Sequence, residues 1–117
     1  MTTSTSQVVF WILTVLAGGR RHGYEIMLET AAASGGRVSL RATTLYGALD
    51  RLERGGQISS DGEEVVNGRA RRYYKITEDG AAQLAVEVEL LESSAQAARV
   101  RLATGHVASL TSSLAVV

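Results

Sequence analysis

The chain has 117 residues, with twelve basic and twelve acidic side chains and therefore no formal net charge. Binding to a polyanion would have to depend on the local distribution of these charges. The absence of cysteine excludes disulfides and thiolate metal sites and favours a reducing, cytoplasmic location. The longest apolar run, residues 8–17, is too short to cross a bilayer, and no signal peptide is readable at the start.

The first predicted helix covers residues 7–17 and follows a Thr/Ser-rich stretch, residues 2–6, that we expect to be frayed. Its apolar residues lie on nearly all sides, which indicates burial on more than one side. Phe10 and Trp11 either belong to the core or line an apolar cleft for an effector. The helix ends at the glycine pair 18–19.

A polar connector that ends in His22 leads to a second predicted helix, residues 23–33. The N-terminus of this helix could bind a phosphate, or His22 could be a local hydrogen-bonding residue. The glycine pair 35–36 ends the helix, and we expect a short extended strand over residues 37–40. The second and third helices then form a compact helix–turn–helix.

The third predicted helix, residues 41–54, has Leu45, Leu49 and Leu52 on one apolar stripe. Its opposite and flanking faces carry Thr43, Thr44, Tyr46, Gly47, Asp50, Arg51 and Arg54. Such a face is either a plain solvated surface or the side of a helix that enters a DNA major groove. A pairing of Asp50 with Arg54 one turn later would neutralise the carboxylate.

A β-hairpin follows, because Asn67-Gly68 is a strong turn signal between strands predicted at residues 57–66 and 69–76. Arginines 69, 71 and 72 form a basic tip that suits a phosphate or a narrow minor groove, although a solvated turn is the simpler alternative. Three helices and a hairpin in this order predict a winged helix–turn–helix. The fold class is mainly α with a small β-hairpin.

Thr77 can cap a last helix, with Gly80 where a capping-box glutamate would stand. This helix is predicted to continue to about residue 103. Its apolar residues repeat at heptad spacing at Leu84, Val88, Leu91, Ala95, Ala98 and Leu102. About 26 helical residues span about 39 Å, more than the width of such a domain, so we expect dimerisation. The alternative is packing onto the chain's own domain.

Gly105 is expected to stop the last helix, and the segment after it is either a short helical turn or a loose tail. The predicted organisation is therefore a DNA-binding domain over residues 1–77, a dimerisation helix over residues 78–104, and a tail of undetermined structure over residues 105–117.

Three segments give the chain a resemblance to the PadR family of winged-helix transcription regulators, which extends over residues 8–103. They are residues 22–26 at the start of the second helix, residues 44–58 in the third helix, and residues 68–80 in the wing and the entry to the last helix. The chain departs from the family at Gly47 and Ala70, where proline is usual. It also has no tryptophan in its last helix, on which some members stack flat effectors.

The resemblance implies that the helix at 41–54 lies in the major groove. The residues expected to contact DNA are Arg41, Thr43, Thr44, Tyr46, Gly47, Arg51, Arg54, Arg69, Arg71, Arg72, His22 and Tyr24. Tyr46 either packs in the core or uses its hydroxyl on a phosphate, and Gly47 would allow close approach to the duplex at a helix-stability cost of about 1 kcal/mol.

We therefore expect a homodimeric, sequence-specific DNA-binding transcriptional regulator. We expect a repressor in preference to an activator, released from DNA by a small apolar or aromatic effector. Its partner would be double-stranded DNA with a palindromic operator, without cofactor, metal or membrane. The alternative is a winged-helix protein–protein interaction module that does not bind DNA. An enzyme is the least expected class, because two distant histidines, no cysteine and no phosphate loop leave little catalytic chemistry.

Overall fold

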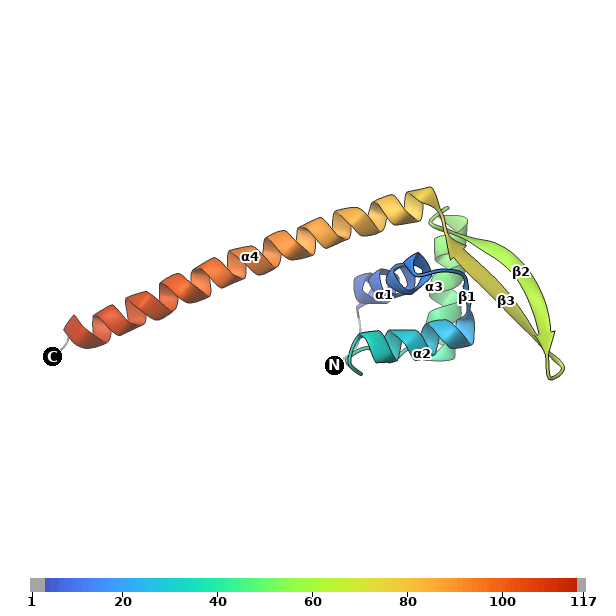
Figure 1. Ribbon diagram of the computed structural model, residues 1–117, viewed down its shortest axis with the longest axis horizontal. Coiled ribbons are helices and arrows are strands. Elements are labelled where there is room, and N and C mark those ends of the chain that lie inside the picture. The colour runs from blue at the N-terminus through green and yellow to red at the C-terminus, as the bar shows by residue number, and fades with distance from the viewer. Residues whose placement is uncertain (1–3, 116–117) are drawn as a thin grey trace. The chain divides into compact units, whose positions relative to one another are not determined.

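The computed structural model describes the backbone of residues 4–115 and the side chains of residues 4–105. The chain divides into two units, residues 1–85 and 86–117. The first unit contains three helices and a small sheet, and α4 begins within it (Figure 1). The predicted winged-helix fold class is confirmed.

The first helix, α1 (Thr5–Ala17), begins two residues earlier than predicted. Ser4 forms a capping box with Gln7, in which each residue's side chain bonds to the other's backbone N–H. Residues 5 and 6 are therefore helical and not frayed. On the inner side of α1, Ile12, Leu13 and Leu16 are fully buried.

The second helix, α2 (Gly23–Ala33), has the predicted bounds, and α3 (Ala42–Arg54) begins one residue after the predicted start. The prediction of a short strand at residues 37–40 is wrong, because this segment pairs with no other strand. Ser34 closes that segment, because its hydroxyl accepts from the Val38 N–H at 3.0 Å and donates to the Val38 carbonyl at 3.3 Å. Val38 and Leu40 are buried beside it.

The sheet has three antiparallel strands in the order β1-β3-β2: β1 (Arg21–His22), β2 (Ile58–Val66) and β3 (Arg69–Ile76). The residues predicted as a polar connector thus include a short strand that pairs with the outgoing wing strand. The hairpin turn has positive φ angles of 52° at Asn67 and 77° at Gly68, as a type I′ turn requires. A bulge interrupts the β2–β3 pairing between Ser60 and Glu63.

One hydrophobic core lies between the three helices and the base of the sheet. The helix α3 contributes Leu45, Ala48, Leu49 and Leu52, all buried, which confirms the predicted apolar stripe. Its other side is consequently turned away from the core. Ile58 and Tyr74 bring the sheet into the same cluster.

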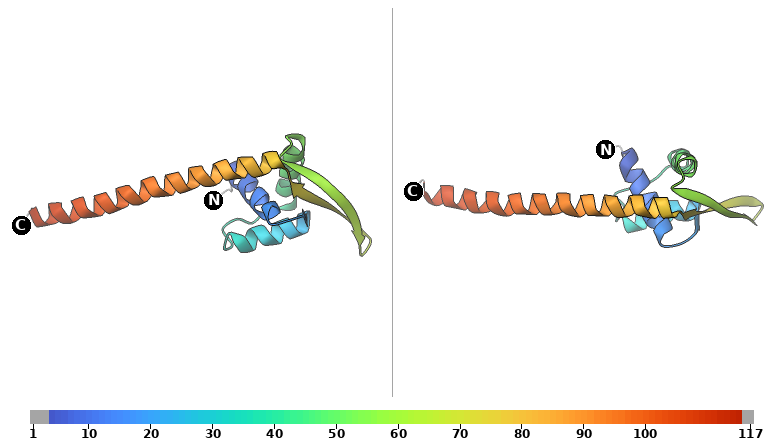
Figure 2. Two further views of the ribbon diagram at one scale, coloured as in Figure 1. Left: turned by 45° about the horizontal axis from the view of Figure 1, so that its top comes forward. Right: turned by 90° about the horizontal axis from the view of Figure 1, so that it is seen from above.

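Helix α4 (Glu78–Ala115) is one continuous helix in both views of Figure 2. Thr77 caps it as predicted, accepting from the Gly80 N–H at 3.1 Å. Gly80 has a packing role as well: a Cβ at this position would lie 2.1 Å from the Gln57 carbonyl oxygen. Only glycine allows the first turn of α4 to approach the connection between α3 and β2 so closely.

The expected end of the last helix at Gly105 is wrong, because α4 continues to Ala115. Glycine inside a helix costs about 1 kcal/mol relative to alanine, but it ends a helix only where it adopts a left-handed or otherwise non-helical conformation. Gly105 is not among the glycines with positive φ. Residues 116–117 of the predicted tail, and the side chains from 106 onward, lie outside the described residues.

Candidate nucleic-acid interface

The outward face of α3 is polar and exposed, as predicted. Thr43 and Thr44 are exposed in the first turn, where a helix N-terminus presents unpaired N–H groups. Arg41 is the N-cap residue and makes no side-chain cap, so its guanidinium is not used to begin the helix. These three residues therefore place hydrogen-bond donors at the N-terminal end of α3, and this end of the helix could enter a DNA groove.

Gly47 lies in the middle of this face with open space in front of it. The nearest described atom to an added Cβ would be Nη1 of Arg51, 3.9 Å away. Unlike Gly80, Gly47 is therefore not required by packing within the described chain. A glycine that weakens an exposed helix without a packing reason suits a surface that something outside the chain approaches closely.

Tyr46 lies outside the buried core and packs against the start of α2. Its side chain is half exposed, and its hydroxyl end lies against the first residue of α2. A Cβ on Gly23 would come within 2.6 Å of the Tyr46 hydroxyl, so glycine at that position makes room for the tyrosine. Tyr46 and the exposed Tyr24 therefore lie where α2 and α3 meet.

The two arginines of α3 differ in their surroundings. Arg54 forms an ion pair with Asp50 one turn earlier, which confirms the expected neutralisation of this carboxylate. Both groups are largely exposed, so the pair adds little to stability. Among residues 4–105, Arg51 has no ion-pair partner and is exposed, which leaves its guanidinium available to an external anion.

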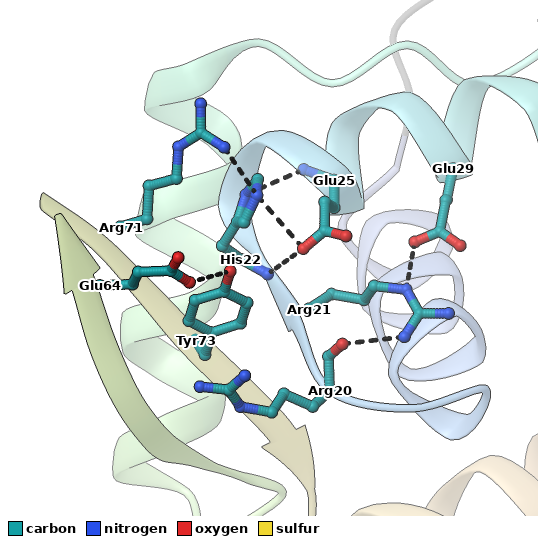
Figure 3. Close-up of polar contacts among 8 residues, drawn as sticks. All are labelled: Arg20, Arg21, His22, Glu25, Glu29, Glu64, Arg71 and Tyr73. Atoms are coloured by element: carbon teal, nitrogen blue, oxygen red, sulfur yellow. Dashed lines mark hydrogen bonds and ion pairs between the residues drawn. The ribbon is translucent and has the colours of Figure 1, made fainter. Parts of the chain in front are cut away.

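His22 serves as the N-cap of α2 and is buried (Figure 3). Its Nδ1 accepts from the Glu25 N–H at 3.3 Å, and the Glu25 carboxylate accepts from the His22 backbone N–H at 3.1 Å. An imidazole that accepts at Nδ1 carries its proton on Nε2. This Nε2 lies 3.2 Å from an oxygen of the Glu25 carboxylate. The structure thus shows the local role for His22.

Arg71 approaches the same imidazole, with Nη1 3.3 Å from Nε2. In the tautomer fixed by the helix cap, Nε2 has no lone pair to accept from a guanidinium. In this tautomer the imidazole therefore accepts no hydrogen bond from Arg71 and uses none of its donors. The N–H groups of Arg71 remain able to bind an anion at the edge of α2 (Figure 3).

The other basic residues before α2 are bound within the domain. Arg20 stacks on the Tyr73 ring at 3.7 Å and bonds to the Asp61 carbonyl through Nε and Nη2. Arg21 donates to Glu29 at 2.6 Å, which raises the pKa of the guanidinium. The Tyr73 hydroxyl donates to Glu64, and this bond raises the tyrosine pKa.

The three wing arginines, predicted as one basic tip, separate into three environments. Arg69 is exposed and forms no ion pair within the part of the chain whose side chains are described. Arg71 lies beside His22, while Arg72 points to the other face and pairs with Glu53 of α3 at 3.0 Å. Adjacent strand residues must face opposite sides, so Arg71 and Arg72 could not share one surface. The contact between Arg72 and Glu53 was not predicted from the sequence. The signal that could have separated Arg71 from Arg72 is the alternation of side chains between the two faces of a strand.

The predicted heptad seam is partly used inside the first unit. Leu84 packs against the hydrophobic core of that unit. In the second unit, Val88, Leu91 and Leu102 are exposed. A second exposed line, missed in the sequence, contains Val86, Leu90 and Val100, which lie about 160–240° around the helix from Leu84 at about 100° per residue.

The two aromatic residues of α1 also differ. Trp11 packs against the core, which supports the core role left open by the sequence. Phe10 is partly buried and meets the Trp11 ring edge-on, with centroids 5.3 Å apart. Among the described residues, no His, Cys, Asp and Glu cluster could hold a metal ion, and no helix is long and apolar enough to span a membrane.

A helix–turn–helix pair followed by a β-hairpin wing, with the second helix turned outward, defines the winged helix–turn–helix class. The family model of the transcriptional regulator PadR-like family matches residues 12–86, more than half of the chain. The chain belongs to this family, as the resemblance implied. The family comprises transcriptional regulators and not enzymes, which confirms the expected class.

Known proteins agree with this assignment. The chain is 45% identical over 53 residues to the transcriptional regulator Rv3488 of Mycobacterium tuberculosis, an alignment that covers 45% of this chain and 49% of that protein. A transcriptional regulator from Clostridium thermocellum is similar in structure, with a TM-score of 0.67, 31% identity, and coverage of 76% of this chain and 86% of that chain. Bacillus subtilis PadR in complex with operator DNA has a TM-score of 0.64 and 21% identity, covering 73% of this chain and 48% of that chain, and shows the shared fold alone.

Proposed function

We propose that this chain is a sequence-specific DNA-binding regulator that places α3 in the major groove of an operator. The observation that carries the proposal is the outward face of α3: exposed threonines at its start, an exposed Arg51 and a Gly47 with open space before it. Short donors near a helix N-terminus can reach base edges, and guanidinium groups bind phosphate or guanine. Membership of a family of transcriptional regulators supports the same function.

The proposed contacts follow the geometry. Thr43, Thr44 and Gly47 face the groove, and Arg41, Arg51 and Arg54 bind base edges or flanking phosphates. Tyr24, Tyr46, Arg69 and Arg71 extend the surface over α2 and the wing. We assign His22 a position behind this surface, because it is buried. Arg72 is assigned to the contact with α3, because its guanidinium already bonds to Glu53.

We further propose that two copies form a homodimer through α4. The seam residues Val88, Leu91 and Leu102 are exposed at heptad spacing, and such a seam is stable only when another surface covers it. A symmetric dimer would present two recognition helices to a palindromic site. The second apolar line on α4, formed by Val86, Leu90 and Val100, could contact a further helix of the partner on the side of α4 opposite the seam.

Selection of bound fragments from genomic DNA tests the proposal. We expect the wild-type protein to enrich a palindromic sequence, with an affinity that falls as salt rises. Replacement of both Arg51 and Arg71 by alanine should reduce the salt slope by about two and the affinity for the selected site by at least about tenfold. Replacement of both Arg99 and Arg101 by alanine, which removes the same two charges from α4, should leave both values unchanged.

A second candidate function is protein–protein recognition by the same winged-helix surface, and the zero net charge of the chain favours it. The selection experiment separates the two functions. Retention of no more DNA than an inert protein of equal charge at low salt would support the protein-binding module and reject the operator-binding regulator.

Repression and release by a small molecule complete the proposal. A dimer seated on an operator would block access to the promoter, so we expect a reporter to be repressed. An apolar or aromatic effector would bind against Phe10, next to the core residue Trp11. Trp11 is the only tryptophan of the chain, so its fluorescence reports on such binding directly. Release from the operator without any change in this fluorescence would place the effector elsewhere.

A further inference from the structure

A polar cluster connects the recognition helix to the wing. Glu53, in the last turn of α3, accepts from Arg72 Nη2 at 3.3 Å through Oε1 and at 3.0 Å through Oε2. It also accepts from the Ser60 hydroxyl at 2.6 Å. Arg72 Nε donates to the same hydroxyl at 3.0 Å, and its Nη2 is bonded there too. Three groups from α3, β2 and β3 therefore form one closed set of hydrogen bonds.

The cluster lies at the point where the wing bends. Ser60 is the last regularly paired residue of β2 before the bulge, and Arg72 pairs with Glu63 directly after it. Within the bulge, Arg20 donates to the Asp61 carbonyl through Nε at 3.0 Å and through Nη2 at 2.9 Å. Gly62, with φ of +94°, provides the left-handed backbone that the bulge requires. The distal wing is thus held on both faces where its direction is set.

We propose that Glu53 is a positioning residue that fixes the angle between the recognition helix and the wing, and so determines specificity for the operator. This inference rests on the proposed DNA-binding function. Helix and wing must reach their contacts on one duplex simultaneously, so an error in their relative angle weakens both sets of contacts. Glu53 holds the angle through Arg72 and Ser60 and does not need to touch the DNA.

Electrostatics alone makes the opposite prediction. A carboxylate at the end of a DNA-binding helix repels phosphates, so its removal should strengthen binding to any DNA. Loss of Glu53 would also release Arg72, which could then bind a phosphate. A positioning role instead predicts weaker binding to the operator, even though the protein has become more positive. The sign of the change therefore distinguishes the two explanations.

The matched pair Glu53→Ala and Asp50→Ala tests the inference. Both substitutions remove one carboxylate from α3 and replace it with a strong helix former. Asp50 bonds only to Arg54 of its own helix, as far as the described side chains show. We expect Glu53→Ala to lose about tenfold in affinity for the operator, the scale of one well-placed contact, while its affinity for unrelated DNA stays equal or rises. Asp50→Ala should lose no affinity for either DNA.

Ser60→Ala is the second variant, because it removes the bridging hydroxyl and leaves every charge in place. We expect a smaller loss for the operator, about threefold, and no change for unrelated DNA. The ratio of the two affinities is the decisive readout. A variant that merely unfolds loses active protein for both DNAs equally, and a lower melting temperature would accompany that loss.

The outcomes separate the inference from the function on which it rests. Failure of the wild-type protein to select any DNA rejects the proposed function itself. Selection by the wild type, with Glu53→Ala binding the operator as well as or better than the wild type, overturns the positioning role alone. Equal losses for operator and unrelated DNA would also overturn it, because they indicate a stability effect. A loss confined to the operator supports it.

Discussion

The two units of the chain treat their apolar residues differently. In the first unit, Ile12, Leu45 and Leu49 are completely buried. In the second unit, Leu91 and Leu102 of α4 are 51% and 73% exposed. The first unit therefore contains its own core, whereas α4 beyond residue 85 exposes the apolar residues that we propose as a dimer surface. The difference separates the unit that defines the fold from the unit on which the proposed dimerisation depends.

The largest expected effect comes from opening the core. Leu49→Ala should lower the free energy of unfolding by about 2–5 kcal/mol, the range for a buried leucine replaced by alanine. Urea denaturation, followed by circular dichroism, measures this change. Leu102→Ala removes the same atoms from an exposed position and should leave the unfolding of the first unit unchanged. A comparable loss for both variants would contradict the distinction between the units.

A substitution in the seam of α4 should weaken the association of two chains without changing the folding of the first unit. Leu91→Asp introduces a charge where we propose that two helices meet. Removal of a well-buried anchor costs about 2 kcal/mol or more, so dimer dissociation should become easier by at least about thirtyfold. Sedimentation velocity over a range of concentrations measures this.

Gln96→Asp provides the control for the seam, because residue 96 lies about 120° around the helix from it. It should leave the dimer intact. A wild-type protein that remains monomeric at every concentration would remove the proposed role of α4 altogether.

A third effect tests the junction where α4 begins. Gly80→Ala would place a Cβ 2.1 Å from the Gln57 carbonyl oxygen, closer than any real contact allows. The backbone must move, and we expect a loss of about 1–3 kcal/mol, as for overpacking elsewhere. Gly105→Ala is the natural comparison, since its added methyl would meet no described atom within 4 Å. It should be neutral or stabilising, and the thermal melting temperatures of the two variants would show the contrast.

Local patterns predicted most of the first unit. The leucine spacing of α3 and the Asn67-Gly68 turn are signals contained in a few neighbouring residues, and both correspond to observed elements. The short strand at Arg21–His22 could not be predicted in this way, because two residues carry no alternation and the pairing is with distant Tyr73 and Tyr74. A sequence shows period and turn chemistry, but not which distant strand supplies the partner.

The same reason explains the outcome for the wing. The sequence grouped Arg71 with Arg72, although neighbouring strand residues face opposite sides. Which side faces α3 depends on how the hairpin packs, and only the structure shows Arg72 beside Glu53. Similarly, Gly105 was predicted to stop a helix that continues through it. Glycine permits a helix end without imposing one.

The smallest expected effect on stability concerns Gly47, where a substitution should raise the stability and not lower it. Gly47→Ala should stabilise α3 by up to about 1 kcal/mol, because alanine is the better helix former and its methyl has open space. Urea denaturation measures this gain. Affinity for the selected operator should nevertheless fall if the α3 backbone approaches the duplex at this residue, since the methyl would then occupy the contact.

Gly35→Ala serves as a control of a different kind, because Gly35 has a φ of +64° and lies outside α3. It should lose stability through backbone strain without a specific loss of operator affinity. A more stable Gly47→Ala protein that binds the operator as tightly as the wild type would show that the duplex does not approach α3 at this point. Greater stability with weaker operator binding would instead show that Gly47 makes α3 less stable at the point where the helix contacts DNA. Gly80, by contrast, is required by packing within the chain itself.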